Sequence, residues 1–251
     1  MASLHCGISV GALFGRRAKM VVRDHEAIDG YAYKGQVRRT AGVALNKTQA
    51  GPYRGGAKRI LDILIVVLSA PFVVPLVALM AILVRRDGGP AFYSQTRVGQ
   101  GGRDYTMWKL RSMVVDADAM FAGHLAANPA ARAEWDATQK LKDDPRITRF
   151  GRFLRKSSLD ELPQLLNVLT GAMSIVGPRP MMPCQQPLYP GNAYYRLRPG
   201  ITGPWQVSAR NEGRFDDRAA YDDAYERDLS LATDVGLILR TFRVVLRATG
   251  Y

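Results

Sequence analysis

The chain has 251 residues, enough for one domain with a sizeable core, and 47% of them are hydrophobic. Basic residues outnumber acidic ones, which gives a formal net charge of +13 and an isoelectric point near 10.0. This charge predicts an anionic partner: a nucleic acid, a phospholipid surface or a phosphorylated substrate. Only three histidines are present, which argues against a metal site or a catalytic triad built on histidine.

Residues 1–57 show no sustained apolar period and are rich in Gly, Arg and Lys. Turn signals stand at Gly51-Pro52 and Gly55-Gly56. We therefore expect a flexible basic N-terminal arm. A disordered tail is favoured over a segment that binds anionic lipid.

An apolar run from Ile60 to Val84 follows, with Lys58-Arg59 before it and Arg85-Arg86 after it. As a straight helix at about 1.5 Å per residue this run would be about 37 Å long, enough to cross a hydrocarbon core of about 30 Å. Cytoplasmic flanks collect Lys and Arg, so positive charge at both ends gives a single crossing no clear orientation. Asp62, near the entrance, is expected to pair with Lys58 or Arg59 at the membrane interface.

Two prolines, Pro71 and Pro75, lie near the middle of the apolar run. Proline removes a helical hydrogen bond and bends or breaks a helix. We therefore expect residues 58–86 to form a re-entrant membrane helix that is broken at one of these prolines and has both ends on the same face. An ordinary kinked transmembrane helix is the alternative.

Residues 91–98 and 105–113 have the composition of short strands, and the glycine-rich stretch 99–102 between them predicts a β-hairpin. Lys109 and Arg111 fall on the same face of the second strand. That face either binds phosphate or is simply solvated.

The rest of the chain is expected to be mainly helical. Residues 114–141 are Ala-rich with an interruption at Asn128-Pro129, and 147–156 form a basic amphipathic helix typical of an anionic membrane surface. The last predicted helix, within 229–248, either docks at the membrane interface or packs on the core. For Trp205, core packing is favoured over contact with lipid or a nucleobase.

Two neighbouring carboxylates, Asp160 and Glu161, stand at the start of an apolar helix, with Arg155 upstream and Arg179 beyond the next turn. Adjacent side chains on a helix point about 100° apart, so one carboxylate can face a metal while the other faces a reacting phosphorus. The alternative is structural. Ser158 and Glu161 match the S-x-x-E capping box of a helix start.

Five motifs in this order resemble those of the bacterial sugar transferases, the monotopic phosphoglycosyl transferases that begin glycan assembly on undecaprenyl phosphate. They are Lys58-Arg59 with Asp62 before an interrupted apolar helix, Lys109 to Met113, Ser158 to Gln164, Met173 to Pro180, and Arg198 to Gly203. The resemblance runs from about residue 58 to the C-terminus. The long segment before Asp143-Asp144-Pro145-Arg146 and the C-terminal ending look most like the ExoY-type galactosyl-1-phosphate transferases.

The resemblance implies that a UDP-sugar, with galactose favoured over glucose, donates its sugar 1-phosphate to undecaprenyl phosphate with Mg²⁺ as cofactor. It implies Asp160 as the nucleophile that forms an aspartyl-phosphosugar intermediate, and Glu161 as the Mg²⁺ ligand. Arg155 and Arg179 match the family's phosphate-binding arginines, and Lys109, Arg111 and Arg198 are weaker candidates for phosphate binding. The implied location is the cytoplasmic face of the bacterial inner membrane, in contact with inner-leaflet phospholipid.

We therefore expect a mostly helical α+β fold: a monotopic membrane protein with a re-entrant helix at 58–86 and a small cytoplasmic catalytic domain at 87–251 that contains the hairpin and interfacial helices. A homo-oligomer is compatible with the sequence. The competing hypothesis is a catalytically silent membrane adaptor, favoured only by Ala172, where the family usually has an acidic residue. A nucleic-acid binder is a distant third, because no nucleic-acid motif accompanies the charge.

Overall fold

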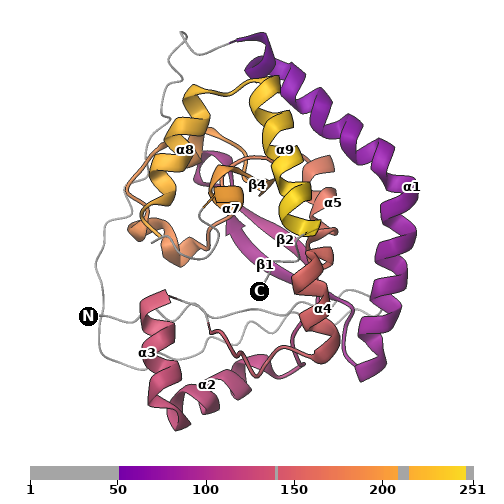
Figure 1. The fold of residues 1–251 in the computed structure, drawn as a ribbon, viewed down its shortest axis with the longest axis vertical. Coiled ribbons are helices and arrows are strands. Elements are labelled where there is room, and N and C mark those ends of the chain that lie inside the picture. Colours follow the sequence, from indigo (N-terminus) through magenta and orange to yellow (C-terminus); the bar gives the residue numbers. More distant parts are fainter. Residues whose placement is uncertain (1–50, 139–140, 209–214, 247–251) are drawn as a thin grey trace, which may run out of the picture.

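The computed structural model describes residues 51–138, 141–208 and 215–246 (Figure 1). Over these residues the chain is mostly helical and contains two small sheets, as the predicted α+β class requires. The α-helices are α1 (Lys58–Val84), α2 (Ala117–Ala127), α3 (Pro129–Thr138), α4 (Arg149–Ser157), α5 (Gln164–Leu169), α6 (Ala193–Arg196), α7 (Pro204–Ser208), α8 (Arg218–Arg227) and α9 (Leu231–Leu246).

The predicted hairpin is confirmed. Strands β1 (Phe92–Val98) and β2 (Asp104–Leu110) pair antiparallel, with Tyr93 opposite Lys109 and Arg97 opposite Tyr105. The chain reverses through Gln100–Gly102, where Gly101 and Gly102 have φ of 71° and 74°. Glycine adopts this left-handed backbone without a steric penalty, so the glycine-rich turn fixes the register of the hairpin.

A second sheet, which the sequence did not predict, pairs β3 (Ser174–Val176) in parallel with β4 (Gly200–Thr202). The two backbones are very close here. A Cβ added to Gly177 would lie 2.2 Å from the carbonyl oxygen of Arg198, and one added to Gly203 would lie 2.0 Å from the carbonyl oxygen of Gly177. These glycines are therefore required for the contact that joins residues 173–180 to residues 198–203.

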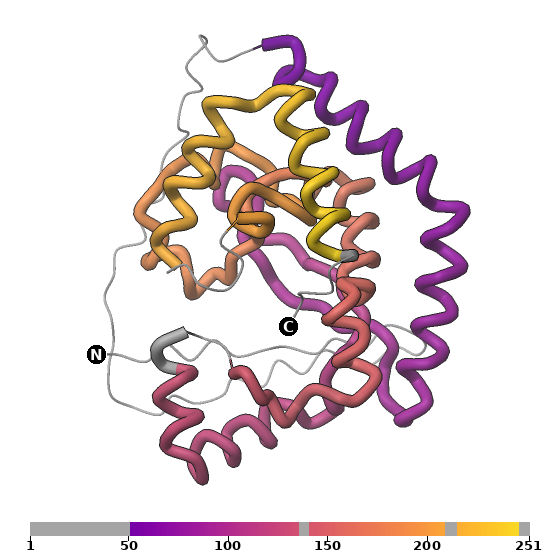
Figure 2. Tube along the Cα trace, in the orientation of Figure 1, coloured from indigo at the N-terminus to yellow at the C-terminus, as the bar shows by residue number. Residues whose placement is uncertain are grey.

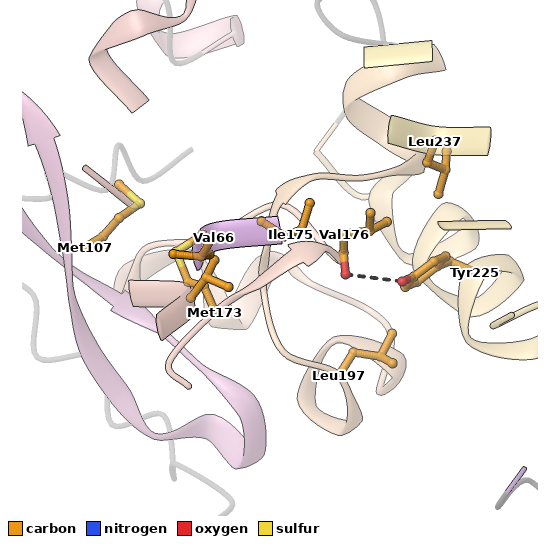
Figure 3. Close-up of a cluster of buried hydrophobic side chains, with 9 residues drawn as sticks. Val66, Met107, Met173, Ile175, Val176, Leu197, Tyr225 and Leu237 are labelled. Atoms are coloured by element: carbon orange, nitrogen blue, oxygen red, sulfur yellow. Dashed lines mark hydrogen bonds between the residues drawn. The ribbon is translucent and has the colours of Figure 1, made fainter. Parts of the chain in front are cut away.

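The main hydrophobic core lies between the hairpin, β3 and the last two helices (Figure 3). It contains Met107 of β2, Val176 of β3, Tyr225 of α8 and Leu237 of α9, together with Val66 of α1. The Tyr225 hydroxyl donates a hydrogen bond to the Val176 carbonyl at 3.2 Å. The apolar helix α1 therefore contributes to the same core as the rest of the domain.

Helix α1 follows the outside of the molecule and bends along its course (Figures 1 and 2). Pro71 and Pro75 both lie inside it, and its helical structure continues through them. Its outward face is apolar and uncovered, with Leu68 72% and Phe72 81% exposed. By length and composition it is the one described helix that could cross a membrane. A bent helix of this kind is compatible with the predicted re-entrant helix, which stays a prediction.

The entrance of α1 is fixed to the domain by buried polar contacts. Asp62 is 2% exposed and accepts hydrogen bonds from Ser174 Oγ at 3.0 Å and from the Ile175 N–H at 2.9 Å. The ammonium of Lys58 instead lies 2.6 Å from an oxygen of Asp234 on α9. The predicted pairing of Asp62 with Lys58 or Arg59 is therefore wrong, because this turn of α1 packs on β3 and not on the membrane interface.

Most of the predicted arm, residues 1–57, lies outside the described residues. Its last part does not: a π-helical turn at Tyr53–Ala57 leads directly into α1. The Tyr53 hydroxyl donates to Asp234 Oδ2 at 2.6 Å, and the Arg54 guanidinium donates to Glu226 Oε1 at 2.6 Å. Residues from Tyr53 onward are thus packed on α8 and α9.

The other helical predictions are confirmed with small changes in their ends. The interruption at Asn128-Pro129 separates α2 from α3, and the Asn128 side chain accepts hydrogen bonds from two N–H groups at the start of α3. For helix α9, packing on the core is confirmed, and docking at the membrane interface stays a prediction. One face packs on the core through Asp234 and Leu237, while Leu239 and Phe242 on the other face are each 63% exposed.

We predict that Asp62→Ala destabilises the fold, because it leaves the Ser174 hydroxyl and the Ile175 N–H buried without their acceptor. An unsatisfied buried donor costs about 1–3 kcal/mol. The thermal unfolding midpoint of the purified protein in detergent is the measurement. Asp104→Ala, at an exposed position in β2, is the control and should leave the midpoint unchanged. Equal midpoints for the two variants would show that Asp62 does not anchor α1.

Candidate active site

The Asp160-Glu161 pair lies in the short connection between α4 and α5. Helix α4 ends at Ser157, and the next residue, Ser158, has a left-handed backbone with φ of 57° and caps the helix through its N–H. A 3₁₀ turn at Leu159–Glu161 follows, and Pro163 occupies the N-cap position of α5, where its missing N–H breaks no helical hydrogen bond. The Ser158 side chain makes no capping bond, so the capping-box alternative is wrong.

One ammonium group lies against both carboxylates. The Lys109 Nζ is 2.7 Å from Glu161 Oε1 and 3.9 Å from Asp160 Oδ2. Asp160 is buried, at 7% exposed, whereas Glu161 is half-buried. The two neighbouring acids therefore differ in their access to solvent, as two groups with different roles would.

Burial raises the pKa of Asp160 above its ordinary value. The positive charge of Lys109 opposes this shift, the negative charge of Glu161 adds to it, and the positive charge of Arg155 also opposes it. Because the buried carboxylate is poorly solvated, its ionised form is stabilised by these two cations. The same poor solvation leaves its oxygens available to react with an electrophile.

Arg155 is positioned by a close contact between α4 and the segment after β2. Its Nε donates to the Ser112 hydroxyl at 2.9 Å. The contact requires Gly151, because a Cβ at that position would lie 1.9 Å from the Ser112 carbonyl oxygen. Burial lowers the pKa of Arg155, and the nearby Asp160 opposes this change. The sequence analysis did not predict the bond from Arg155 to Ser112, although Ser112 stands within the Lys109–Met113 motif.

The other three predicted arginines lie in different settings. Arg111 is buried and donates to the carboxylate of Asp87 and to the carbonyl groups of Val84, Pro90 and Met113, so it ties the end of α1 to β2. Arg198 donates to the Gly171 carbonyl at 3.0 Å. Phosphate binding by Arg111 and Arg198 stays a prediction, and both have a structural partner.

Arg179 follows β3 and is half-buried. Its guanidinium carbon lies 5.7 Å from the centre of the Trp205 ring. Of the predicted phosphate-binding groups, the structure therefore brings Lys109 and Arg155 to the two carboxylates and places Arg179 beside an aromatic side chain of α7.

The apolar helix α1 ends next to this site. Met80 and Val84 at the end of α1 pack in one hydrophobic cluster with Leu110 of β2 and Leu154 of α4. These strands and helices carry Lys109 and Arg155, so the apolar helix and the carboxylates belong to one packed unit.

No group of three or more His, Cys, Asp or Glu side chains suited to a metal occurs in the part of the chain that the structure describes. Mg²⁺ has a smaller requirement, since it is commonly held by one or two carboxylates together with substrate phosphates and water. Asp160 and Glu161 supply such carboxylates, and Lys109 already places a cation between them. The residues therefore fit a magnesium ion that arrives with a phosphorylated ligand.

A family comparison places this site in a known context. The family model described as "Bacterial sugar transferase" matches residues 53–248. The chain belongs to the bacterial sugar transferase family. This bacterial sugar transferase is 45% identical over 195 residues to the undecaprenyl-phosphate galactose phosphotransferase of Salmonella typhimurium, a stretch that covers 77% of this chain and 41% of that protein.

Two further relatives differ in length, and one of them is named for glucose. The exopolysaccharide production protein ExoY of Sinorhizobium fredii is 43% identical over 202 residues, 79% of this chain and 89% of that protein. The UDP-glucose:undecaprenyl-phosphate glucose-1-phosphate transferase of Caulobacter vibrioides is 37% identical over 195 residues, 73% of this chain and 67% of that protein. This bacterial sugar transferase thus spans less than half of some curated relatives and most of ExoY.

We predict that Gly151→Ala destabilises the protein, since its methyl group would overlap the Ser112 carbonyl. Overpacking of this kind costs about 1–3 kcal/mol. Gly123→Ala is the matched control, because Gly123 also lies in a helix but has no atom within 4 Å of an added Cβ. That change should be neutral or stabilise by up to about 1 kcal/mol. Thermal unfolding of both variants is the measurement, and a neutral Gly151→Ala would contradict the close contact.

Proposed function

We propose that this protein transfers a sugar 1-phosphate from a UDP-sugar to undecaprenyl phosphate, giving undecaprenyl-diphosphate-sugar and UMP. The observation that supports it most is the buried Asp160 carboxylate, which lies near Glu161, Lys109 and Arg155. Its neighbour Leu159 packs on the hydrophobic cluster at the end of α1. Galactose is the sugar we propose first, because the Salmonella typhimurium relative is named as a galactose phosphotransferase and is more similar to this chain than the relative named for glucose.

In the proposed reaction Asp160 is the nucleophile. Its carboxylate oxygen attacks the phosphorus that bears the sugar, a P–O bond to Asp160 forms, and the bond to UMP breaks. A phosphate oxygen of undecaprenyl phosphate then attacks the same phosphorus and releases the Asp160 carboxylate. Splitting the transfer into two steps lets a water-soluble donor and a lipid acceptor react at one site without meeting.

A carboxylate that approaches an anionic diphosphate is repelled by it, and the cations of the site reduce this repulsion. Lys109 and Arg155 both act on Asp160, and both can contact the phosphate oxygens on which charge develops. Glu161 is the residue we propose to hold Mg²⁺, which when bound neutralises charge on the phosphate oxygens.

The contacts of α1 support a monotopic topology at the cytoplasmic face of the inner membrane. Its 27 residues would span about 40 Å if straight, more than a hydrocarbon core of about 30 Å. Yet Asp62 near its start binds β3, and Val84 at its end packs on β2 and α4 of the same domain. One small domain cannot hold both ends of a helix that crosses the bilayer. We therefore propose that α1 enters the inner leaflet, with the segment around Pro71 and Pro75 deepest, and returns.

The exposed apolar side chains agree with this placement. The middle of α1 exposes Leu68 and Phe72, and the outer face of α9 exposes Leu239 and Phe242. Together they offer inner-leaflet phospholipid an apolar surface next to a basic protein.

The direct test of the function is UMP release from UDP-galactose in membranes that contain undecaprenyl phosphate and Mg²⁺. We predict that Asp160→Asn abolishes UMP release, because the amide is not a nucleophile, while membrane association and unfolding midpoint are retained. Glu161→Gln should raise the Mg²⁺ concentration needed for half-maximal rate. Near-normal release by Asp160→Asn would remove the covalent mechanism.

A pH profile tests the electrostatic role of Lys109. Only the ionised form of Asp160 can attack, so the rate should rise with pH as that group loses its proton. The charge of Lys109 lowers the pKa of Asp160, and Lys109→Met removes this effect. The acid limb of the variant should therefore lie at higher pH than that of the wild type, whereas Lys142→Met, at an exposed position, should leave it in place. An unmoved acid limb in Lys109→Met would contradict the coupling.

Cysteine labelling tests the course of α1. Single cysteines at Ala57 and Arg86, which are both exposed, are introduced after the native Cys6 and Cys184 are changed to serine. We predict that a membrane-impermeant maleimide labels both positions from the cytoplasmic side of inverted vesicles and neither position in intact spheroplasts. Labelling of one position from each side would show a transmembrane helix.

A further inference from the structure

A second group of cations lies apart from Lys109 and Arg155. It consists of Arg97 on β1, Arg179 after β3 and Arg218 at the start of α8. Figure 1 shows α7 and α8 on one side of the β1–β2 hairpin and α1 on the opposite side. We call these three residues the arginine cluster. Of the three, only Arg179 was predicted to bind phosphate, because Arg97 and Arg218 lie in none of the five family motifs.

The arginine cluster carries more positive charge than acids in residues 51–138, 141–208 and 215–246 neutralise by ion pairs. Arg179 repels both Arg97 and Arg218, and Arg97 also repels Arg218. Burial and this repulsion lower the pKa of Arg97 to about 10 and that of Arg218 to about 9, so both stay charged at neutral pH. Among the charges that act most strongly on these two arginines, the one carboxylate is Asp222.

Asp222 is a weak counter-charge. Burial raises its pKa to about 7, and it accepts a hydrogen bond from the Tyr189 hydroxyl at 2.9 Å. In the described part of the chain no acid forms an ion pair with any member of the arginine cluster. The Nε atoms of Arg97 and Arg218 are also buried without a hydrogen-bond partner there. Half-buried cations without a counter-charge are costly unless a ligand supplies that charge.

Aromatic rings hold the cluster in place. The Arg218 guanidinium carbon lies 4.4 Å from the centre of the Trp205 ring and 4.3 Å from that of Phe215, and Arg179 also contacts the Trp205 ring. Stacking of a guanidinium on aromatic faces fixes its plane while leaving its N–H groups available to an anion. Arg97 is fixed by donation to the Pro180 carbonyl and to the Gln95 side chain.

The hairpin connects this cluster to the carboxylates. Tyr93 and Arg97 are four residues apart on one face of β1, a separation of about 13 Å. Tyr93 pairs in register with Lys109, whose ammonium contacts Glu161. Arg97 and Arg155 both act electrostatically on the Tyr93 hydroxyl. The arginine cluster and the Asp160-Glu161 pair thus lie toward the two ends of one strand face.

We propose that the arginine cluster is the subsite for the nucleotide phosphate of the donor, the phosphate that leaves as UMP. The inference rests on the proposed function and extends it, because it assigns Arg97 and Arg218 to the soluble substrate. When the bond between the two donor phosphates breaks, negative charge develops on the departing nucleotide phosphate, and three guanidinium groups stabilise that charge. A lipid phosphate is the less favoured source, since α7 and α8 lie across the hairpin from α1.

The test compares Arg218→Gln with Arg227→Gln in the full chain reconstituted in nanodiscs. Arg227 is the control because it is exposed at the other end of the same helix. Binding of UMP is measured by calorimetry without acceptor, and KM is measured separately for UDP-galactose and undecaprenyl phosphate. Loss of one charge-assisted contact should weaken UMP binding and raise the donor KM by about 10- to 100-fold. The acceptor KM and the Arg227→Gln variant should be unchanged.

Two more variants keep the result interpretable. Arg218→Lys retains the charge without the flat stacking group and should fall between wild type and Arg218→Gln. If Arg218→Gln unfolds, Arg179→Gln takes its place, since Arg179 is half-buried and is not held by an ion pair in the described residues.

The outcomes separate this inference from the proposed function. If the Arg218→Gln and Arg179→Gln variants bind UMP as tightly as the wild type, and the wild-type protein turns over, the subsite assignment is wrong. The proposed transferase function would still stand. A rise in the acceptor KM alone would assign the cluster to the lipid phosphate and overturn the nucleotide assignment. A wild-type protein that neither binds nor releases UMP would remove the proposed function itself.

Discussion

The contact of one lysine with two adjacent carboxylates is the interaction on which the rest of the site depends. Asp160 is buried next to Glu161, and without Lys109 and Arg155 the pair would place two negative charges in a poorly solvated position. The hairpin supplies Lys109 and α4 supplies Arg155. The hairpin turn and the Gly151–Ser112 contact therefore have a direct electrostatic purpose, because each sets the position of one of these cations.

Much of this arrangement could be predicted from the sequence. The glycine-rich turn predicted the hairpin, and the spacing of Asp160 and Glu161 predicted two acids with different surroundings. The bond from Arg155 to Ser112 could not be predicted, because it joins residues 43 apart. The same holds for Asp62, whose neighbours in sequence are basic but whose actual partners are on β3. Local patterns gave the elements, while long-range polar contacts depended on how those elements pack.

The partners of the arginines could likewise not be predicted from local sequence patterns. The resemblance implied phosphate binding for Arg155 and Arg179 and, more weakly, for Arg111 and Arg198. The fold gives these four arginines different partners. Arg111 is surrounded by acceptors at the end of α1, whereas Arg179 lies by Trp205 and two arginines that no motif had singled out. The contacts of helix α1 could likewise not be predicted from its sequence. Its apolar length is that of a membrane span, but its contacts at both ends tie it to one domain.

The central claim is that Asp160 carries the sugar phosphate between donor and acceptor. The most direct measurement incubates the purified protein with UDP-galactose labelled in the sugar, without undecaprenyl phosphate, and maps the label by peptide analysis. The account predicts label on the peptide that contains Asp160, its discharge when undecaprenyl phosphate is added, and none in Asp160→Asn. Normal turnover with no label on that peptide at any time would contradict it.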